Sequence, residues 1–154
     1  MSFFQSTYQY TVDEKGRINI PAKFRKPDES IAYDKFVITR GLDGCLFVYP
    51  VAEWEKVKEK IRELPYTLRK TRLYERYVIP NTVEAEVDKQ GRITIPQHLL
   101  EYAKIKKEVK ILGMLERIEI WDPEVLSEYY FQAGKSYEDV AEELFLGEEN
   151  PKKE

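Results

Sequence analysis

The sequence predicts an α+β fold made of one unit that occurs twice. The first observation is a repeated phrase, because residues 12–21 read VDEKGRINIP and residues 87–96 read VDKQGRITIP. The second is that each phrase leads through a proline into a short helical stretch, two strand-like stretches and a longer helix. The third is chain length, since 154 residues suit two small units that share a core better than two independent cores.

The first unit begins with strand-like alternation on both sides of a turn. We predict strands over Tyr8–Val12 and Arg17–Ile20, joined by residues 13–16 as a β-hairpin. Asp13 can accept hydrogen bonds from backbone N–H groups further along the turn, and Gly16 can adopt the positive φ that its end requires. Asp88 and Gly91 hold the same positions in the second copy and are expected to shape its turn in the same way.

The residues after the turn alternate between the two faces of the strand. Ile18 and Ile20 should therefore enter the core, while Arg17 faces solvent. Two interpretations of this arginine are open from the residues alone. It forms an ion pair with Asp13 or a neighbouring acid and the turn is structural, or it is presented to a binding partner.

The remaining elements of the first unit follow in order. Pro21 suits the first turn of a helix, and Pro65 ends a later one. The predicted elements are a short helix over residues 22–25, strands over Lys35–Thr39 and Cys45–Tyr49, and a helix over Ala52–Leu64 with an apolar stripe. A basic helix over Leu68–Tyr77 then leads to the second unit; it presents either a solvated face or a phosphate-binding one.

The second unit repeats this order. The predicted elements are a short helix over Gln97–Tyr102, strands over Val109–Leu112 and Arg117–Trp121, and a helix from near Pro123 to a break at Gly134. The division is 1–64 for the first unit with its helix, 65–81 for a basic helical linker, 82–134 for the second unit, and 135–154 for an acidic C-terminal tail. We expect a short amphipathic helix over Tyr137–Phe145 and disorder over 147–154.

Charge and composition exclude several classes of protein. The net charge of −3 indicates that any surface for nucleic acid is local, and residues 1–134 are nearly neutral. No apolar run could span a bilayer and no signal peptide begins the chain, so a cytoplasmic protein without membrane partners is expected. A lone Cys45 and a lone His98 provide neither a metal site nor a catalytic pair, and we expect no cofactor, no metal and no enzymatic activity.

The repeated phrases resemble a known family. VDEKGRINIPAKFR and VDKQGRITIPQHLL, together with RGLDGCLFVYPVAEWEK at 40–56 and EIWDPE at 119–124, are similar in order and spacing to the MraZ family of bacterial regulators with tandem SpoVT-AbrB-type domains. The resemblance covers residues 1 to about 135. It implies a duplicated swapped-hairpin, AbrB-like β-barrel that forms a pseudo-dimer within one chain, with flanking short helices. It also implies ring-like homo-oligomers.

The resemblance further implies a function and a site. The function is transcription regulation at the promoter of the division and cell-wall gene cluster, including the chain's own gene, through G-rich direct repeats in double-stranded DNA. Such a protein would be cytoplasmic and nucleoid-associated. The DNA-contacting role carries over to Arg17 and, less securely, to Arg92, with Lys15 and Lys89 as the basic residues of the same two turns.

Elementary energetics agree with an assembly of several turns. One arginine that contacts guanine contributes about 1–3 kcal/mol of base discrimination, whereas specific sites need about 4–10 kcal/mol. Exposed aromatic residues near the start, namely Phe3, Phe4, Tyr8 and Tyr10, are expected to provide apolar surface for the oligomer. The alternatives are a protein-interaction scaffold or antitoxin-like module that acts through the tail, and an enzyme that uses His98.

Overall fold

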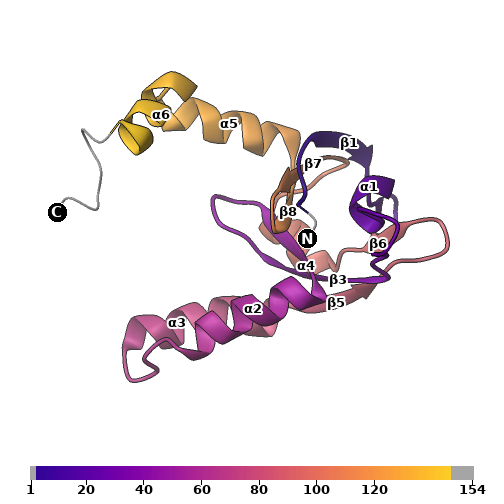
Figure 1. The fold of residues 1–154 in the computed structure, drawn as a ribbon, viewed down its shortest axis with the longest axis horizontal. Helices are drawn as coiled ribbons and strands as arrows, with labels where there is room; N and C mark the ends of the chain where they lie inside the picture. The colour runs from indigo at the N-terminus through magenta and orange to yellow at the C-terminus, as the bar shows by residue number, and fades with distance from the viewer. Residues whose placement is uncertain (1–2, 147–154) are drawn as a thin grey trace.

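A computed structural model describes residues 3–146, and its ribbon is shown in Figure 1. The strands are β1 (Thr7–Thr11), β2 (Arg17–Asn19), β3 (Lys35–Arg40), β4 (Leu46–Pro50), β5 (Val83–Glu86), β6 (Arg92–Thr94), β7 (Glu108–Met114) and β8 (Arg117–Trp121). The helices are α1 (Ala22–Arg25), α2 (Val51–Arg62), α3 (Arg69–Val78), the 3-10 turn η1 (Ile79–Asn81), α4 (Gln97–Tyr102), α5 (Pro123–Ala133) and α6 (Tyr137–Phe145). This α+β order repeats once, as predicted. The disorder expected over 147–154 lies outside the described residues.

The strands form two antiparallel sheets that join the two units. The larger sheet has the order β1-β7-β8-β4-β3-β5, and β2 pairs with β6 in a two-stranded sheet. The first strand of each unit pairs with the third strand of the other, since β1 lies against β7 and β5 lies against β3. The fourth strands, β4 and β8, pair directly. Each unit therefore supplies strands to the core of the other.

The predicted β-hairpin over residues 8–20 is wrong as a pair of hydrogen-bonded strands. β1 and β2 are joined by a tight turn, but β1 pairs along its length with β7, and β2 pairs with β6 in the register Ile18↔Ile93. The turn retains two hydrogen bonds, from the N–H of Asp13 to the carbonyl of Arg17 and from the N–H of Gly16 to the carbonyl of Asp13. Both strands pair with strands of the second unit, and local alternation carries no information about partners.

The sheets do not close into a barrel. Among residues 3–146, β2 and β6 pair only with each other, so β1 and β5 remain the outer strands of the larger sheet. The expected closed barrel is therefore absent from the strand pairing of the described chain. The mixed α+β class with a mostly antiparallel sheet is confirmed.

The core contains the isoleucines that the repeated phrases predicted. Ile18, Ile20, Ile93 and Ile95 are all buried in one cluster that both units build. The larger aliphatic members contributed by the six-stranded sheet are Ile38, Leu46, Val48, Val109, Ile111, Ile118 and Ile120. The two phrases therefore fill one shared core.

The prediction of exposed aromatic residues at the start of the chain is wrong except at Phe3. Phe4 is only 2% exposed and packs edge-on against Phe24, while Phe3 is 49% exposed. Tyr8 and Tyr10 are half-buried against the same core. Two backbone hydrogen bonds fix this segment. The N–H of Phe4 donates to the carbonyl of Leu115 at 2.8 Å, and the N–H of Leu115 donates to the carbonyl of Phe4 at 2.7 Å. Phe4, Tyr8 and Tyr10 therefore belong to the packing of the core.

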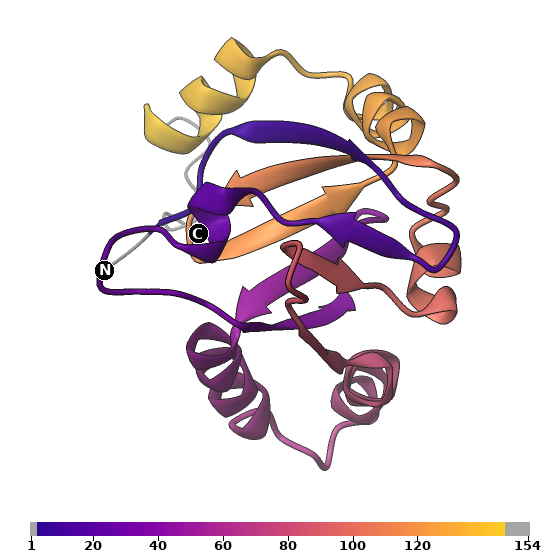
Figure 2. The ribbon, with the colours of Figure 1, turned by 90° about the vertical axis from the view of Figure 1, so that its right-hand side faces the viewer.

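The helices α2 and α3 lie on one side of the sheets and α5 and α6 on the other, as Figure 2 shows. On one side, Trp54 of α2 and Val78 of α3 pack on Val37 of β3. On the other, Leu126 of α5 packs on Trp121, and Asp122 caps this helix by accepting the N–H groups of residues 124 and 125. The predicted helices are confirmed to within about two residues at each end. No helix within residues 3–146 combines the length and the apolar composition required to cross a membrane.

Candidate nucleic-acid interface

The first repeated turn is held by one carboxylate. Oδ1 of Asp13 accepts the backbone N–H of Lys15 at 2.9 Å and that of Arg17 at 2.8 Å. Oδ2 of the same side chain accepts Nε of Arg17 at 2.6 Å. Gly16 closes the turn with a φ of 81°, a conformation that glycine adopts without strain. The aspartate thus fixes both the backbone of the turn and the direction of the arginine.

The second turn has the same geometry. Oδ1 of Asp88 accepts the N–H groups of Gln90 and Arg92, both at 2.9 Å, and Oδ2 accepts Nε of Arg92 at 2.9 Å. Gly91 again has a φ of 81°. The same hydrogen bonds therefore recur in both copies of the Asp-x-x-Gly-Arg sequence.

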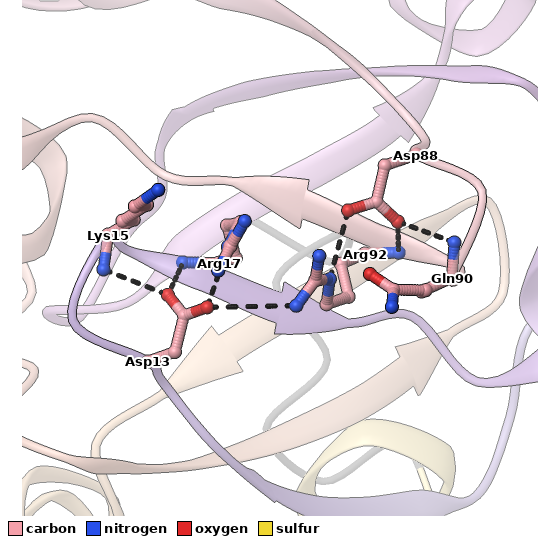
Figure 3. Close-up of polar contacts among 6 residues, drawn as sticks. All are labelled: Asp13, Lys15, Arg17, Asp88, Gln90 and Arg92. Carbon is pink, nitrogen blue, oxygen red and sulfur yellow. Dashed lines mark hydrogen bonds and ion pairs between the residues drawn. The ribbon is translucent and has the colours of Figure 1, made fainter.

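The β2–β6 pairing brings the two turns together, as Figure 3 shows. The pairs flanking Ile18↔Ile93 set Arg17 opposite Thr94 and Arg92 opposite Asn19. Nη1 of Arg92 lies 3.8 Å from Oδ2 of Asp13 in the other unit. Both arginines therefore converge on Asp13, and the chain presents two paired arginines on one short ribbon.

The sequence left open whether Arg17 pairs with Asp13, and in the structure the two side chains form an ion pair. The Arg17 side chain is 31% exposed and that of Arg92 is 23% exposed, so neither extends freely into solvent. The bond to Asp13 uses Nε, and within residues 3–146 the two Nη atoms of Arg17 donate no hydrogen bond to another residue. These Nη atoms can therefore donate to an acceptor outside the chain without breaking the turn.

The carboxylates of both turns are stabilised in their charged form. The backbone N–H of Arg17 lowers the pKa of Asp13, helped by the Arg17 side chain and by the N–H of Lys15, against a smaller opposing effect of desolvation. The backbone N–H of Arg92 lowers the pKa of Asp88 in the same way. Both carboxylates are thus charged at neutral pH.

The two predicted lysines are exposed but do not occupy equivalent positions. Lys15 precedes Gly16, and its counterpart in the second turn is Gln90. Lys89 follows Asp88, and its counterpart in the first turn is the acidic Glu14. The second turn therefore carries the more positive local charge, although its arginine is the less exposed one.

The sequence did not identify Arg25, a third arginine at this site. Its Nε donates to the carbonyl of Ile20 at 2.8 Å, and a Cβ on Gly91 would lie 2.7 Å from its Cζ. The guanidinium of the first unit thus lies over the turn of the second. Leu100 occupies the equivalent place beside Gly16. The difference between arginine and leucine at matched positions of the two copies was the signal that could have found it.

Other chemistry receives no support from the described residues. His98 is exposed on α4, and burial raises the pKa of the Cys45 thiol above its usual range. No cluster of three potential metal ligands occurs within residues 3–146. What the site can do is donate hydrogen bonds and positive charge from a rigid ribbon.

Comparisons with known proteins agree with the resemblance of the two phrases. The family described as "MraZ protein, putative antitoxin-like" matches twice, over residues 3–77 and 78–147. A protein of Caldanaerobacter subterraneus subsp. tengcongensis named transcriptional regulator MraZ is 50% identical over 137 residues, which cover 89% of this chain and 93% of that protein. One from Halothermothrix orenii with the same name is 49% identical over 138 residues, covering 90% and 94%. The two tandem matches and these identities show that the chain belongs to the MraZ family.

Proposed function

We propose that this chain is a sequence-specific regulator of transcription that binds double-stranded DNA through its two Asp-x-x-Gly-Arg turns. The supporting observation is the convergence of Arg17 and Arg92 on one ribbon, with the Nη atoms of Arg17 not engaged by described residues. The relatives are named as transcriptional regulators rather than enzymes, in line with the expectation of no enzymatic activity. The same proposal makes double-stranded DNA the partner of the chain and places the chain in the cytoplasm, at the nucleoid.

Each residue of the site has a role in this proposal. Arg17 reads a guanine edge in the major groove, because its guanidinium offers two parallel donors to the guanine acceptors. Arg92 contributes less, because it is less exposed and is held by both Asp88 and Asp13. Lys15, Lys89 and Arg25 contact phosphates, which sets affinity and salt dependence rather than sequence preference.

The proposal extends to the target and the assembly. The target is the promoter of the division and cell-wall gene cluster, including the chain's own gene, read as G-rich direct repeats. The assembly is a ring-like homo-oligomer. One guanine contact contributes about 1–3 kcal/mol of base discrimination, which is less than the roughly 4–10 kcal/mol that separates specific from non-specific binding. The chain itself is inferred to be a pseudo-dimer of swapped hairpins, with units at 1–64 and 82–134, the linker at 65–81 and the acidic tail at 135–154. The cross-unit pairs β1–β7 and β3–β5 support this division.

The experiment that tests the proposal is a gel-shift with the DNA upstream of the chain's own gene, at physiological salt and against a scrambled duplex of equal composition. Binding to the upstream DNA alone is expected. Equal retention of both duplexes would contradict specific recognition.

A protein-interaction or antitoxin-like module is the second candidate. The observation that favours it is the exposed apolar surface of α5 and α6. Under that function, Arg17→Ala would leave activity in the cell unchanged and the tail would be indispensable. The Arg17 variant therefore separates the two candidates.

A further inference from the structure

Arg40 lies at the end of β3, between two tyrosines of other elements. Its Cζ lies 4.7 Å from the ring centre of Tyr102 on α4 and 5.8 Å from that of Tyr77 on α3. Both distances are within the roughly 6 Å over which an aromatic face attracts a cation. Nε of Arg40 is shielded from solvent and donates to no acceptor within residues 3–146. The two aromatic rings are thus the partners that the structure gives to this guanidinium.

The contact with Tyr102 fixes the C-terminal end of α4. Tyr102 is the last residue of this helix, and its hydroxyl donates to the carbonyl of Gly41 at 2.9 Å. Arg40 and Gly41 are consecutive, so one short segment of the first unit holds both the ring and the hydroxyl of Tyr102. Because α4 belongs to the second unit, this attachment joins the two units.

The opposite end of α4 supports the first repeated turn. The N–H of Ile95, two residues before α4 begins, donates to the carbonyl of Gly16 at 2.8 Å. Leu100 of α4 lies 3.5 Å from the position that a Cβ on Gly16 would occupy. The first turn, and with it Arg17, is therefore packed on a helix whose far end is held by Arg40.

The second turn has a different support. When the two units are aligned on their repeated phrases, Pro27 stands at the position of Tyr102. Proline has neither an aromatic face nor a hydroxyl, so the contacts that Tyr102 makes cannot form there. The guanidinium of Arg25 covers the second turn instead. The second turn is therefore an internal control for any substitution at Arg40.

We infer that Arg40 is a positioning residue for the first turn: it stacks on Tyr102 and fixes α4, and α4 fixes the turn that presents Arg17. The role is indirect, because the helix stands between Arg40 and the turn. The support of the turn is a property of the free chain. Its consequence for DNA rests on the proposed function.

Hydrogen–deuterium exchange of the free chain tests this support without DNA. The probes are the N–H groups of Lys15 and Arg17 in the first turn and those of Gln90 and Arg92 in the second, all of which donate to the aspartate of their own turn. Exchange of such groups reports local opening. Mass spectrometry of peptides from the two turns, with labelling times from milliseconds upward, measures both turns in the same molecules.

Arg40→Met removes the guanidinium and keeps an unbranched side chain that adapts to the same space. Exchange in the first turn is expected to be at least about threefold faster than in the wild type, because a shielded cation–π contact is lost, and exchange in the second turn should be unchanged. Tyr102→Leu should give the same result. The two substitutions together should add little, since they remove one contact. Tyr102→Phe keeps the ring and should keep more of the protection than Tyr102→Leu.

The matched control is Arg117→Met. Arg117 also stacks on a ring, with its Cζ 4.5 Å from the ring centre of Phe47, and it pairs with Glu119. A general loss of stability in this variant should appear at both turns to the same extent. Unchanged exchange in the first turn of Arg40→Met and Tyr102→Leu, or equal acceleration at both turns of these variants, would overturn the inference.

DNA binding is measured on Tyr102→Leu, which changes no charge. Its affinity for the promoter duplex should fall by at least about threefold, while its affinity for a scrambled duplex and its salt dependence should match the wild type, because no phosphate contact is lost. Promoter affinity equal to that of the wild type, beside faster exchange, would show that Arg40 does not position Arg17 for DNA.

A gel-shift of the wild type with its upstream DNA is read separately. Faster exchange in the first turn of the variants, without promoter binding by the wild type, would uphold the support of the turn by Arg40 and reject the proposed function. Promoter binding by the wild type, with unchanged exchange in the variants, would do the reverse.

Discussion

Asp13 is shared by the arginines of both units: its Oδ2 lies 2.6 Å from Nε of Arg17 and 3.8 Å from Nη1 of Arg92. Among residues 3–146, Arg92 is the only arginine that pairs with Asp88. The duplicated turns are therefore unequal, and the first aspartate orients the donors of both. This inequality leads to different expectations for substitutions that look equivalent in the sequence.

Asp13→Asn should reduce sequence discrimination more than Asp88→Asn. Asparagine keeps an acceptor for the turn N–H groups but loses the charge that orients Arg17 and attracts Arg92. We expect the ratio of specific to non-specific DNA affinity to fall by the equivalent of about 1–3 kcal/mol in Asp13→Asn, and by less in Asp88→Asn. Fluorescence anisotropy with promoter and scrambled duplexes measures both ratios. An equal loss in the two variants would show that the cross-unit contact has no role.

Stability should fall in acid through these two carboxylates. Their folded pKa values lie below that of an unperturbed aspartate, so the folded chain binds fewer protons than the unfolded chain does. The stabilisation is fully present above the unfolded pKa and is lost as pH falls through the lowered folded pKa. Thermal unfolding from pH 2 to pH 7 should show a difference between wild type and Asp13→Asn that narrows below about pH 4. A constant difference at all pH values would contradict the role of this charge.

Gly16→Ala should destabilise the fold more than Gly134→Ala. Both glycines have positive φ, so both substitutions add backbone strain of about 1–3 kcal/mol. A Cβ at Gly16 would in addition lie 2.7 Å from the carbonyl oxygen of Ile95, whereas at Gly134 the nearest atom is 3.9 Å away. Urea unfolding gives both free energies. Equal losses of unfolding free energy in the two variants would mean that the close contact between residue 16 and the Ile95 carbonyl relaxes without an energetic cost.

Arg25→Leu should weaken DNA binding without changing sequence preference. The substitution copies Leu100 of the second unit and removes the guanidinium from above Gly91. If Arg25 contacts a phosphate, affinity for promoter and scrambled duplexes should fall together, and the slope of log affinity against log salt should decrease by about 1 for each site. Titrations at several salt concentrations measure the slope. An unchanged slope would remove Arg25 from the interface.

The local structure of this chain could be predicted from its sequence. The repeated Asp, Gly and Arg predicted turns that the structure forms twice with the same bonds, and the alternating isoleucines predicted core residues that are buried. The α6 helix has the predicted bounds, because Ser136 caps it and accepts the N–H of Asp139. Each of these features depends on residues that lie only a few positions apart in the sequence.

Pairing between distant segments could not be predicted. β1 alternates in the manner of a hairpin strand, but its partner β7 lies about a hundred residues away. Phe4 looked like exposed surface because its cover, Phe24 and the strand near Leu115, comes from elsewhere. In the sequence Arg25 is the last residue of a short helix, and only the fold brings the second turn beneath its side chain. The interactions that define the site are those between the two units.

Operator architecture should follow from the assembly. Copies that repeat around a ring approach DNA in the same sense, so the site should consist of direct repeats rather than one palindrome. Affinity should rise steeply over duplexes with one to four repeats, because added contacts act at high effective concentration. The series is measured by anisotropy at constant salt. Equal affinity for one and four repeats, or a need for inverted repeats, would exclude this mode of reading.

The measurement that tests the central claim most directly is the affinity of Arg17→Ala for promoter DNA. The matched control is Lys60→Ala, which removes one exposed positive charge from α2, far from the turns. We expect Arg17→Ala to lose at least about tenfold in affinity for the promoter duplex, consistent with the loss of one bidentate guanine contact, and to approach its affinity for a scrambled duplex. Its assembly and its melting temperature should match those of Lys60→Ala. Promoter affinity equal to that of the wild type would show that Arg17 does not read DNA.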